Sequence, residues 1–206
     1  MGFRMKLWPQ KRWKKMLFAI LLSVLVAAAA LMAFVVYDIT RVNFAGGLRV
    51  INPNGSKTAL LVYQPGMSSF PTDIAYGFAK GLAENGWRVE ITTASNQAPT
   101  NVSKYSLLVL VFPIYGDAPG KAIVHYIERT ENLLGVETFL LSGSAGKNPL
   151  TGQTWSPQDS IKRMTQLVDS ANGTVEGTLS LFTVAANKEG ESAVDIATRT
   201  GSQYSA

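Results

Sequence analysis

The sequence predicts an α/β fold, a doubly wound parallel sheet of five strands, preceded by one transmembrane helix. Three observations support this prediction. Apolar runs of strand length alternate with amphipathic helical patterns from Thr58 onward. The run at 106–112 is apolar on both faces, as a central parallel strand is. A stretch of 21 residues without a charge, 16–36, lies near the N-terminus.

The positive charge is concentrated at the N-terminus. The 206 residues carry a net charge of +5. Residues 1–36 hold six basic side chains and no acid, whereas residues 37–206 hold 13 basic and 14 acidic ones. The basic charge therefore does not indicate binding to nucleic acid, and we expect no such partner. The absence of cysteine and the single histidine, His125, argue against a thiolate or histidine-rich metal site, so we expect no metal.

The uncharged stretch predicts a transmembrane anchor at 16–37, with the lipid bilayer as its partner. About 20 helical residues cross the hydrocarbon core, and Trp13 and Tyr37 lie where interfacial aromatic residues are expected. The alternative is a cleaved signal peptide, whose apolar region is usually shorter, about 7–15 residues. Small residues in "AAAALMA" would suit such a cleavage.

The flanking charges predict the orientation of the anchor. Six basic residues precede it, so the positive-inside rule places the N-terminus in the cytoplasm and the C-terminal domain outside. In that case the sequons at Asn54, Asn101 and Asn172 are candidates for glycosylation. The predicted organisation is a basic segment (1–15), the anchor (16–37), a connector (38–57) and one folded domain (58–206).

Strand and helix patterns alternate through the domain. Predicted strands cover 58–63, 87–93, 106–112, 137–143 and 174–185, the last with a bulge at Gly177. Predicted helices cover 71–84, 120–134, 157–170 and 189–199. The alternation in 87–93 predicts an edge strand with one solvated face, and 144–156 is expected to be a long loop. Strands joined by such helices form right-handed crossovers, so the sheet is covered on both faces.

Ligands of such a sheet bind beyond the carboxyl ends of its strands. Those ends are the loops at 64–72, 113–119 and 142–152. The sequence "VFPIYGDAP" (111–119) is similar to the segment that packs against the flavin ring in the flavodoxin-like family. The loop "QPGMSSFPT" (64–72) resembles that family's hydroxyl-rich phosphate cradle, and "SGSAG" (142–146) lies where the family has a third flavin-contacting loop.

The resemblance covers nearly all of the domain and implies a strand order of 2-1-3-4-5 and FMN as cofactor. It also implies a redox partner protein and no catalytic side chain, because the flavin carries the chemistry. The residues implied to bind FMN are Gly66, Ser68, Ser69, Thr72, Pro113, Tyr115, Gly116, Ser142 and Gly143.

The residues themselves support the FMN hypothesis in part. Hydroxyls and backbone N–H groups near a helix N-terminus suit a phosphate, and a tyrosine ring suits an isoalloxazine. However, Ser69 stands where the family usually has glycine, and Pro71 stands where its last threonine would be. Asp117 would either accept a hydrogen bond from the ligand or cap the following helix. The alternatives are an ordinary strand-to-helix turn for the first loop and a proline-fixed turn with a half-exposed tyrosine for the second. At the second loop the position at the switch point favours the ligand.

Other common chemistries are not indicated. "GSAGKN" lacks the spacing of a nucleotide-hydrolysing P-loop, and no G-x-S-x-G motif is present. Two hypotheses remain, an FMN-binding electron-transfer protein and a non-catalytic interaction module on a scaffold that has lost FMN. The predicted topology and Pro71 favour the second, since FMN is normally supplied in the cytoplasm.

Overall fold

A computed structural model of the chain describes residues 12–146, 156–183 and 191–206. The chain divides into two compact units between Asp38 and Ile39. Helix α1 (Arg12–Thr40) makes up nearly all of the described part of the first unit, and it is long and apolar enough to cross a membrane. A signal sequence would meet the same criteria.

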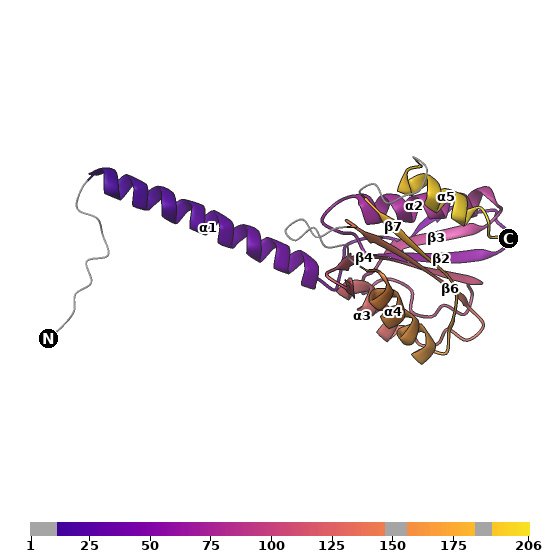
Figure 1. Cartoon of the computed structure of the whole chain (residues 1–206). Helices are drawn as coiled ribbons and strands as arrows, with labels where there is room; N and C mark the ends of the chain where they lie inside the picture. Colours follow the sequence, from indigo (N-terminus) through magenta and orange to yellow (C-terminus); the bar gives the residue numbers. More distant parts are fainter. Residues whose placement is uncertain (1–11, 147–155, 184–190) are drawn as a thin grey trace. The chain divides into compact units, whose positions relative to one another are not determined.

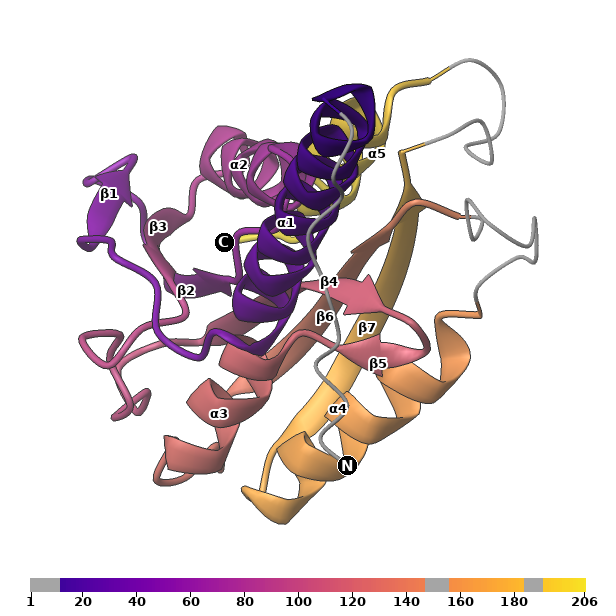
Figure 2. The same cartoon turned by 90° about the vertical axis from the view of Figure 1, so that its left-hand side faces the viewer.

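In the residues that the structure describes, the second unit is built on one mixed sheet of seven strands (Figures 1 and 2). Five of them are parallel, in the order β3-β2-β4-β6-β7, which is the predicted order 2-1-3-4-5. The two others pair antiparallel, β1 with β3 and β5 with β4. The strands are β1 (Arg49–Ile51), β2 (Thr58–Tyr63), β3 (Arg88–Thr93), β4 (Leu107–Tyr115), β5 (Ala118–Pro119), β6 (Glu137–Ser144) and β7 (Thr174–Phe182).

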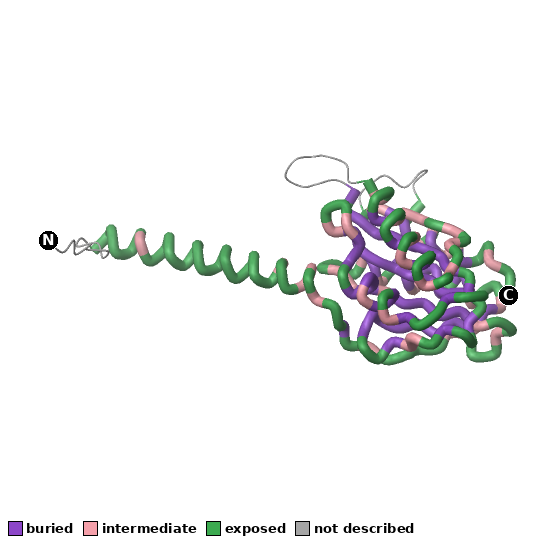
Figure 3. The backbone as a smooth tube through the Cα atoms, turned by 90° about the horizontal axis from the view of Figure 1, so that it is seen from below, coloured by how far each residue is buried: buried purple, intermediate pink, exposed green. Residues whose placement is uncertain are grey.

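Four helices of the described part of the chain cover the two faces of this sheet, α2 and α5 on one face and α3 and α4 on the other (Figure 2). Each pair encloses a hydrophobic core, and the buried strands form the centre of the unit (Figure 3). This arrangement confirms the predicted doubly wound fold. The helices are α2 (Phe70–Glu84), α3 (Lys121–Arg129), α4 (Gln158–Ser170) and α5 (Ala193–Gly201).

Two short antiparallel strands, β1 and β5, join the five predicted parallel ones, and β3 is not an edge strand. β1 comes from the segment expected to be a connector, and it covers the outer side of β3 through the pair Val50 and Glu90. The face of β3 that was expected to be solvated is buried as well, with Glu90 only 4% exposed. Upstream of β1, Phe44 is also buried in the core. The core therefore begins well before Thr58.

Two other boundaries differ from the prediction. The helix expected over 120–134 ends at Arg129, because Thr130 is extended and its hydroxyl donates to the Tyr126 carbonyl, 3.1 Å away. The strand expected to end at 112 continues to Tyr115 and turns back into β5. The bulge at Gly177 is confirmed by a register shift opposite Phe139, whose ring leaves no room for a side chain at this glycine. Three predictions fall in part outside the described residues. They are the loop at 144–156, the end of the strand at 174–185 and the start of the helix at 189–199, which extend into 147–155 and 184–190.

Candidate functional site

The carboxyl ends of β2, β4 and β6 are neighbours at one edge of the sheet. The chain leaves β2 toward β3 on one side and later returns to β4 on the other, so a topological switch point lies between β2 and β4. The three predicted ligand-binding segments begin at this edge of the sheet. They are the β2–α2 loop, the β4–β5 hairpin and the end of β6.

Gln64 is the first residue after β2 and fixes the start of the β2–α2 loop. Its side chain is fully buried and its Oε1 accepts hydrogen bonds from the backbone N–H groups of Ala122 (3.0 Å) and Ile123 (3.2 Å). These N–H groups belong to the first turn of α3, so Gln64 caps that helix from a different loop. The contact holds the β2–α2 loop against the segment that follows the β4–β5 hairpin. Gly120 allows it, because a Cβ there would lie 2.3 Å from Gln64 Oε1.

The rest of the β2–α2 loop exposes backbone donors. Met67, Ser68 and Ser69 are exposed, and Ser69 precedes the first residue of α2 without a side-chain cap. The backbone N–H groups of Met67, Ser68, Ser69 and Phe70 donate to no residue in the described part of the chain. The same holds for the Ser68 and Ser69 hydroxyls within the described ranges. Consecutive open donors at a helix N-terminus form a suitable environment for an anion.

The second predicted loop is a tight β-hairpin rather than an open loop. Tyr115 pairs with Ala118 across a turn in which Gly116 has a φ of 51°, a conformation that favours glycine. Pro113 pairs with Gly143 of β6 and accepts a hydrogen bond from Gly120 N–H at 2.9 Å. Asp117 is exposed at the tip.

The first loop and the hairpin approach each other at Tyr115. A Cβ added to Gly66 would lie 3.4 Å from the Tyr115 hydroxyl and 3.0 Å from Pro71 Cγ. The half-buried Tyr115 therefore lies beside the β2–α2 loop. The absence of a side chain at Gly66 leaves room for the Pro71 ring.

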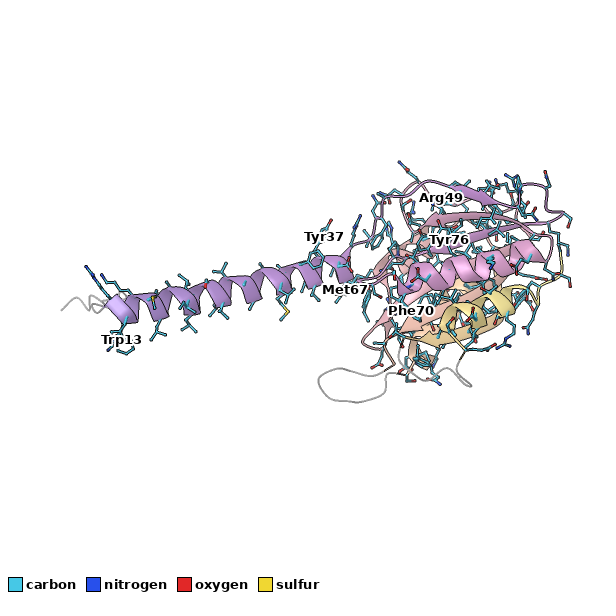
Figure 4. The ribbon with its side chains drawn as sticks, turned by 90° about the horizontal axis from the view of Figure 1, so that it is seen from above. Trp13, Tyr37, Arg49, Met67, Phe70 and Tyr76 are labelled. Atoms are coloured by element: carbon cyan, nitrogen blue, oxygen red, sulfur yellow. The ribbon has the colours of Figure 1, made fainter. Side chains whose placement is uncertain are left out.

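The end of β6 is covered by other side chains of the protein. A Cβ added to Gly143 would lie 3.0 Å from Phe70 Cε1, so the Phe70 ring lies over this glycine; Figure 4 labels Phe70 at the start of α2. The Ser142 hydroxyl is buried and forms a hydrogen bond of 2.8 Å with the Ser180 hydroxyl of β7. Neither Ser142 nor Gly143 is presented to the space beside Tyr115.

Thr72 does not join Ser68 and Ser69. It lies within the first turn of α2 and lines a separate pocket of about 340 Å³ together with Tyr63, Tyr76 and Arg49, on the β3 side of β2. Each residue of a helix is rotated by about 100° from the one before, which separates Thr72 from the loop that precedes α2. Ser68 and Ser69 thus belong to the loop that reaches Tyr115 at Gly66, whereas Thr72 lines a different pocket and Ser142 and Gly143 are covered by other side chains.

Two residues of this edge were not singled out from the sequence. Gln64 gave a weak signal, a polar residue directly after a buried strand, which is where a side chain can reach a neighbouring loop. Phe70 gave no signal beyond an aromatic residue before Pro71. Its contact with Gly143 depends on side-chain packing between elements far apart in the sequence.

Comparisons with known proteins were made for sequence and for structure. No protein-family model matches the chain, and no curated protein matches it. Among solved structures it is similar to oxidised flavodoxin 1 from Bacillus cereus, with a TM-score of 0.53 and 12% identity, over 71% of this chain and 95% of the flavodoxin. It is also similar to two-electron reduced Megasphaera elsdenii flavodoxin, with a TM-score of 0.54 and 14% identity, over 71% of this chain and 99% of the flavodoxin. The Flv1 flavodiiron core from Synechocystis matches with a TM-score of 0.55 and 11% identity, over 73% of this chain and 36% of the flavodiiron chain.

These similarities show that the domain has the fold of flavodoxins. Identities of 9 to 14% leave the residues at the ligand edge free to differ. The function must therefore be argued from the site itself.

Proposed function

We propose that the domain binds FMN at the β2–α2 loop and the β4–β5 hairpin and takes part in electron transfer at a membrane. The observation that carries this proposal is the run of N–H groups from Met67 to Phe70 that donate to no described residue, in a loop whose Gly66 lies next to the Tyr115 hydroxyl. Flavodoxins with the same fold are its second support.

The residues at this edge fit the phosphate end of FMN. Four N–H groups and the hydroxyls of Ser68 and Ser69 would surround the phosphate, and the N-terminus of α2 would add a favourable dipole. Tyr115 would stack against one side of the ring, and Gly116 would allow close approach of the hairpin backbone. Bound FMN supplies the redox chemistry, and the protein residues hold, orient and shield it.

The membrane assignment forms part of this proposal. We propose that α1 anchors the chain with its N-terminus in the cytoplasm and the domain outside, because the basic residues precede the helix. The anchored domain would then meet a redox partner protein close to the bilayer.

A second candidate function is supported by Phe70. Its ring lies over Gly143, and Ser142 bonds to Ser180, so the third family loop offers no open surface at these two residues. Under this alternative the domain is a non-catalytic interaction module that retains the fold without the cofactor. The Phe70→Ala variant separates the two candidates. If Phe70 excludes a flavin, its removal creates binding that the wild-type chain lacks.

The direct test is an FMN titration of the purified full-length chain in detergent. We expect quenching of FMN fluorescence on binding, and we expect the S68A/S69A double variant to weaken affinity by about tenfold or more, since hydrogen bonds to a charged group are lost. Ser170→Ala, an exposed serine at the end of α4, is the matched control and should bind as wild type. Absence of quenching, or equal affinity of wild type and double variant, would overturn the proposal.

A further inference from the structure

A second pocket lies across β2 from the candidate FMN site. Its volume is about 340 Å³, close to the lower end of the usual range for small-molecule sites. Tyr63 at the end of β2 and Ile91, Thr92 and Thr93 of β3 contribute to it, and Thr72 and Tyr76 come from α2. Residues 45–47, which precede β1, and Arg49 of β1 also line it. Figure 4 labels Arg49 on β1 and Tyr76 on the neighbouring α2.

The walls of this pocket are held in place by specific contacts. Gly46 packs directly on Thr93, because a Cβ there would lie 2.4 Å from Thr93 Oγ1. The neighbouring Phe44 is buried, and its carbonyl accepts a hydrogen bond from Thr93 Oγ1 at 3.4 Å. Thr72 and Tyr76 are four residues apart and therefore share one face of α2. The pocket is thus closed on one side by a segment that is fixed to the sheet.

The charge in the pocket has one sign. Among the described residues that line the pocket, Arg49 is the single charged one, and none is a carboxylate. Within the described ranges, the Arg49 guanidinium makes no hydrogen bond or ion pair. Burial and the neighbouring Tyr76 raise the pKa of Tyr63, whereas Arg49 acts in the opposite direction.

The uncharged groups of the pocket complement this cation. The Tyr63 and Tyr76 rings meet edge to face, with centroids 6.1 Å apart, and Ile91 adds an apolar surface. The Thr72 hydroxyl and the backbone N–H of Gly47 donate to no residue in the described part of the chain, whereas the Tyr76 hydroxyl is hydrogen-bonded with the Tyr63 hydroxyl and keeps part of its capacity for a ligand. An unpaired guanidinium with several neutral donors suits a group with several acceptor oxygens, such as a phosphate, and the apolar part suits a small organic body.

We propose that this pocket is a binding site for a small organic phosphate, with Arg49 as its anion-binding residue. The phosphate would be held by the Arg49 guanidinium and by the hydroxyls of Thr72 and Tyr76. Its organic part would lie against Ile91 and the tyrosine rings. The site is separate from the proposed FMN site and does not depend on it.

The test is calorimetric titration of the full-length chain in phosphatidylcholine nanodiscs with glycerol 3-phosphate, with glycerol as the uncharged control ligand. We expect saturable binding of glycerol 3-phosphate alone. Arg49→Gln should weaken it by about tenfold or more, and Arg49→Lys should weaken it less, because lysine keeps the charge without the planar fork. Tyr76→Phe should weaken binding by about fivefold. Lys80 is an exposed cation on α2, the helix that carries Tyr76, so Lys80→Gln is the matched control and should not alter binding.

A phosphate can also come from a lipid head group, so a second arm uses phosphatidylglycerol. Native mass spectrometry of the detergent-solubilised chain would show whether this lipid is retained by wild type and lost in Arg49→Gln. Retention only of phosphatidylglycerol assigns the site to a lipid head group, and binding only of glycerol 3-phosphate assigns it to a soluble ester. Absence of both, or binding that Arg49→Gln leaves unchanged, overturns the proposal. The Arg49→Gln variant should bind FMN with the affinity of the wild type. A wrong proposal for one site can therefore be recognised without affecting the test of the other.

Discussion

Two buried polar residues, Gln64 and Glu90, connect segments that are far apart in the sequence. Gln64 joins the end of β2 to the start of α3 through two hydrogen bonds from backbone N–H groups. Glu90 accepts hydrogen bonds from Tyr105 (2.6 Å), Lys104 (3.0 Å) and Arg88 (3.0 Å). A buried carboxylate is stable only when it is paired in this way. Both residues therefore fix loops that lead into or out of the sheet.

The Glu90 network predicts a pH-dependent contribution to stability. Burial raises the pKa of Glu90, but the hydrogen bonds from Tyr105, Lys104 and Arg88 outweigh it, so its pKa is lowered overall. A carboxyl group with a lowered pKa stabilises the fold above its unfolded-state pKa, and this contribution is lost as the pH falls through its folded-state pKa. Glu90→Gln should reduce the free energy of unfolding by about 1–3 kcal/mol at pH 7.

Denaturant unfolding of the full chain at pH 7 and at successively lower pH checks this prediction. The difference between wild type and Glu90→Gln should narrow as the carboxyl group becomes protonated. The matched control is Glu84→Gln, which changes an exposed carboxylate paired only with Lys80 across one helical turn. A difference that stays constant with pH would contradict the assigned role of the Glu90 charge.

At the scale of elements, the segment before β2 is part of the fold. Phe44 is 5% exposed and packs with Ala94 and Ala98, and the Arg41 guanidinium lies 4.4 Å from the centroid of its ring. The backbone N–H of Phe44 donates to the Ala94 carbonyl at 3.3 Å. Together with β1, these contacts cover β3 and close one side of the second pocket.

Phe44→Ala should therefore destabilise the domain by about 3–5 kcal/mol, the usual cost of removing a buried aromatic side chain. Chemical denaturation with intrinsic fluorescence measures this loss. Val42→Ala removes an exposed apolar side chain from the same segment and should change the free energy of unfolding little. Equal stability of the Phe44→Ala variant and the wild type would show that the segment is only a linker.

The sequence predicted the long elements better than the short ones. The run at 106–112 is apolar throughout, and such a run has few alternatives to a central strand. β1 and β5 have only three and two residues, too few to give a period, and their pairing depends on β3 and β4. Glu90 suggested a solvated face because a charged residue in a strand is usually exposed. Two of its three partners, Lys104 and Tyr105, lie on another segment, so the strand pattern alone did not reveal them.

The candidate site was predictable in its location but not in its details. Parallel strands place their carboxyl ends together, so the three loops could be named from the strand order alone. Whether Gly143 stays open depends on the direction of the Phe70 side chain, and whether Thr72 faces the loop depends on where α2 begins. Both are properties of packing that local patterns do not contain.

At the scale of the whole molecule, the proposal describes an FMN-binding domain with the flavodoxin fold and an N-terminal membrane helix. The fold is shown by its structural neighbours, and the cofactor is the central claim that requires a test. The proposed binding mode makes a specific prediction, since most of the protein groups proposed to bind the cofactor would surround its phosphate. A flavin without this phosphate should lose most of the affinity.

The most direct measurement compares the dissociation constants of the full-length chain for FMN and for riboflavin, which has the same ring and no phosphate. The account predicts that FMN binds at least about a hundredfold more tightly, because several hydrogen bonds to a charged group are absent with riboflavin. In the S68A/S69A double variant, the ratio of the dissociation constants for riboflavin and FMN should be smaller than in the wild type. Equal affinities for the two flavins, or no measurable binding of FMN, would contradict the account.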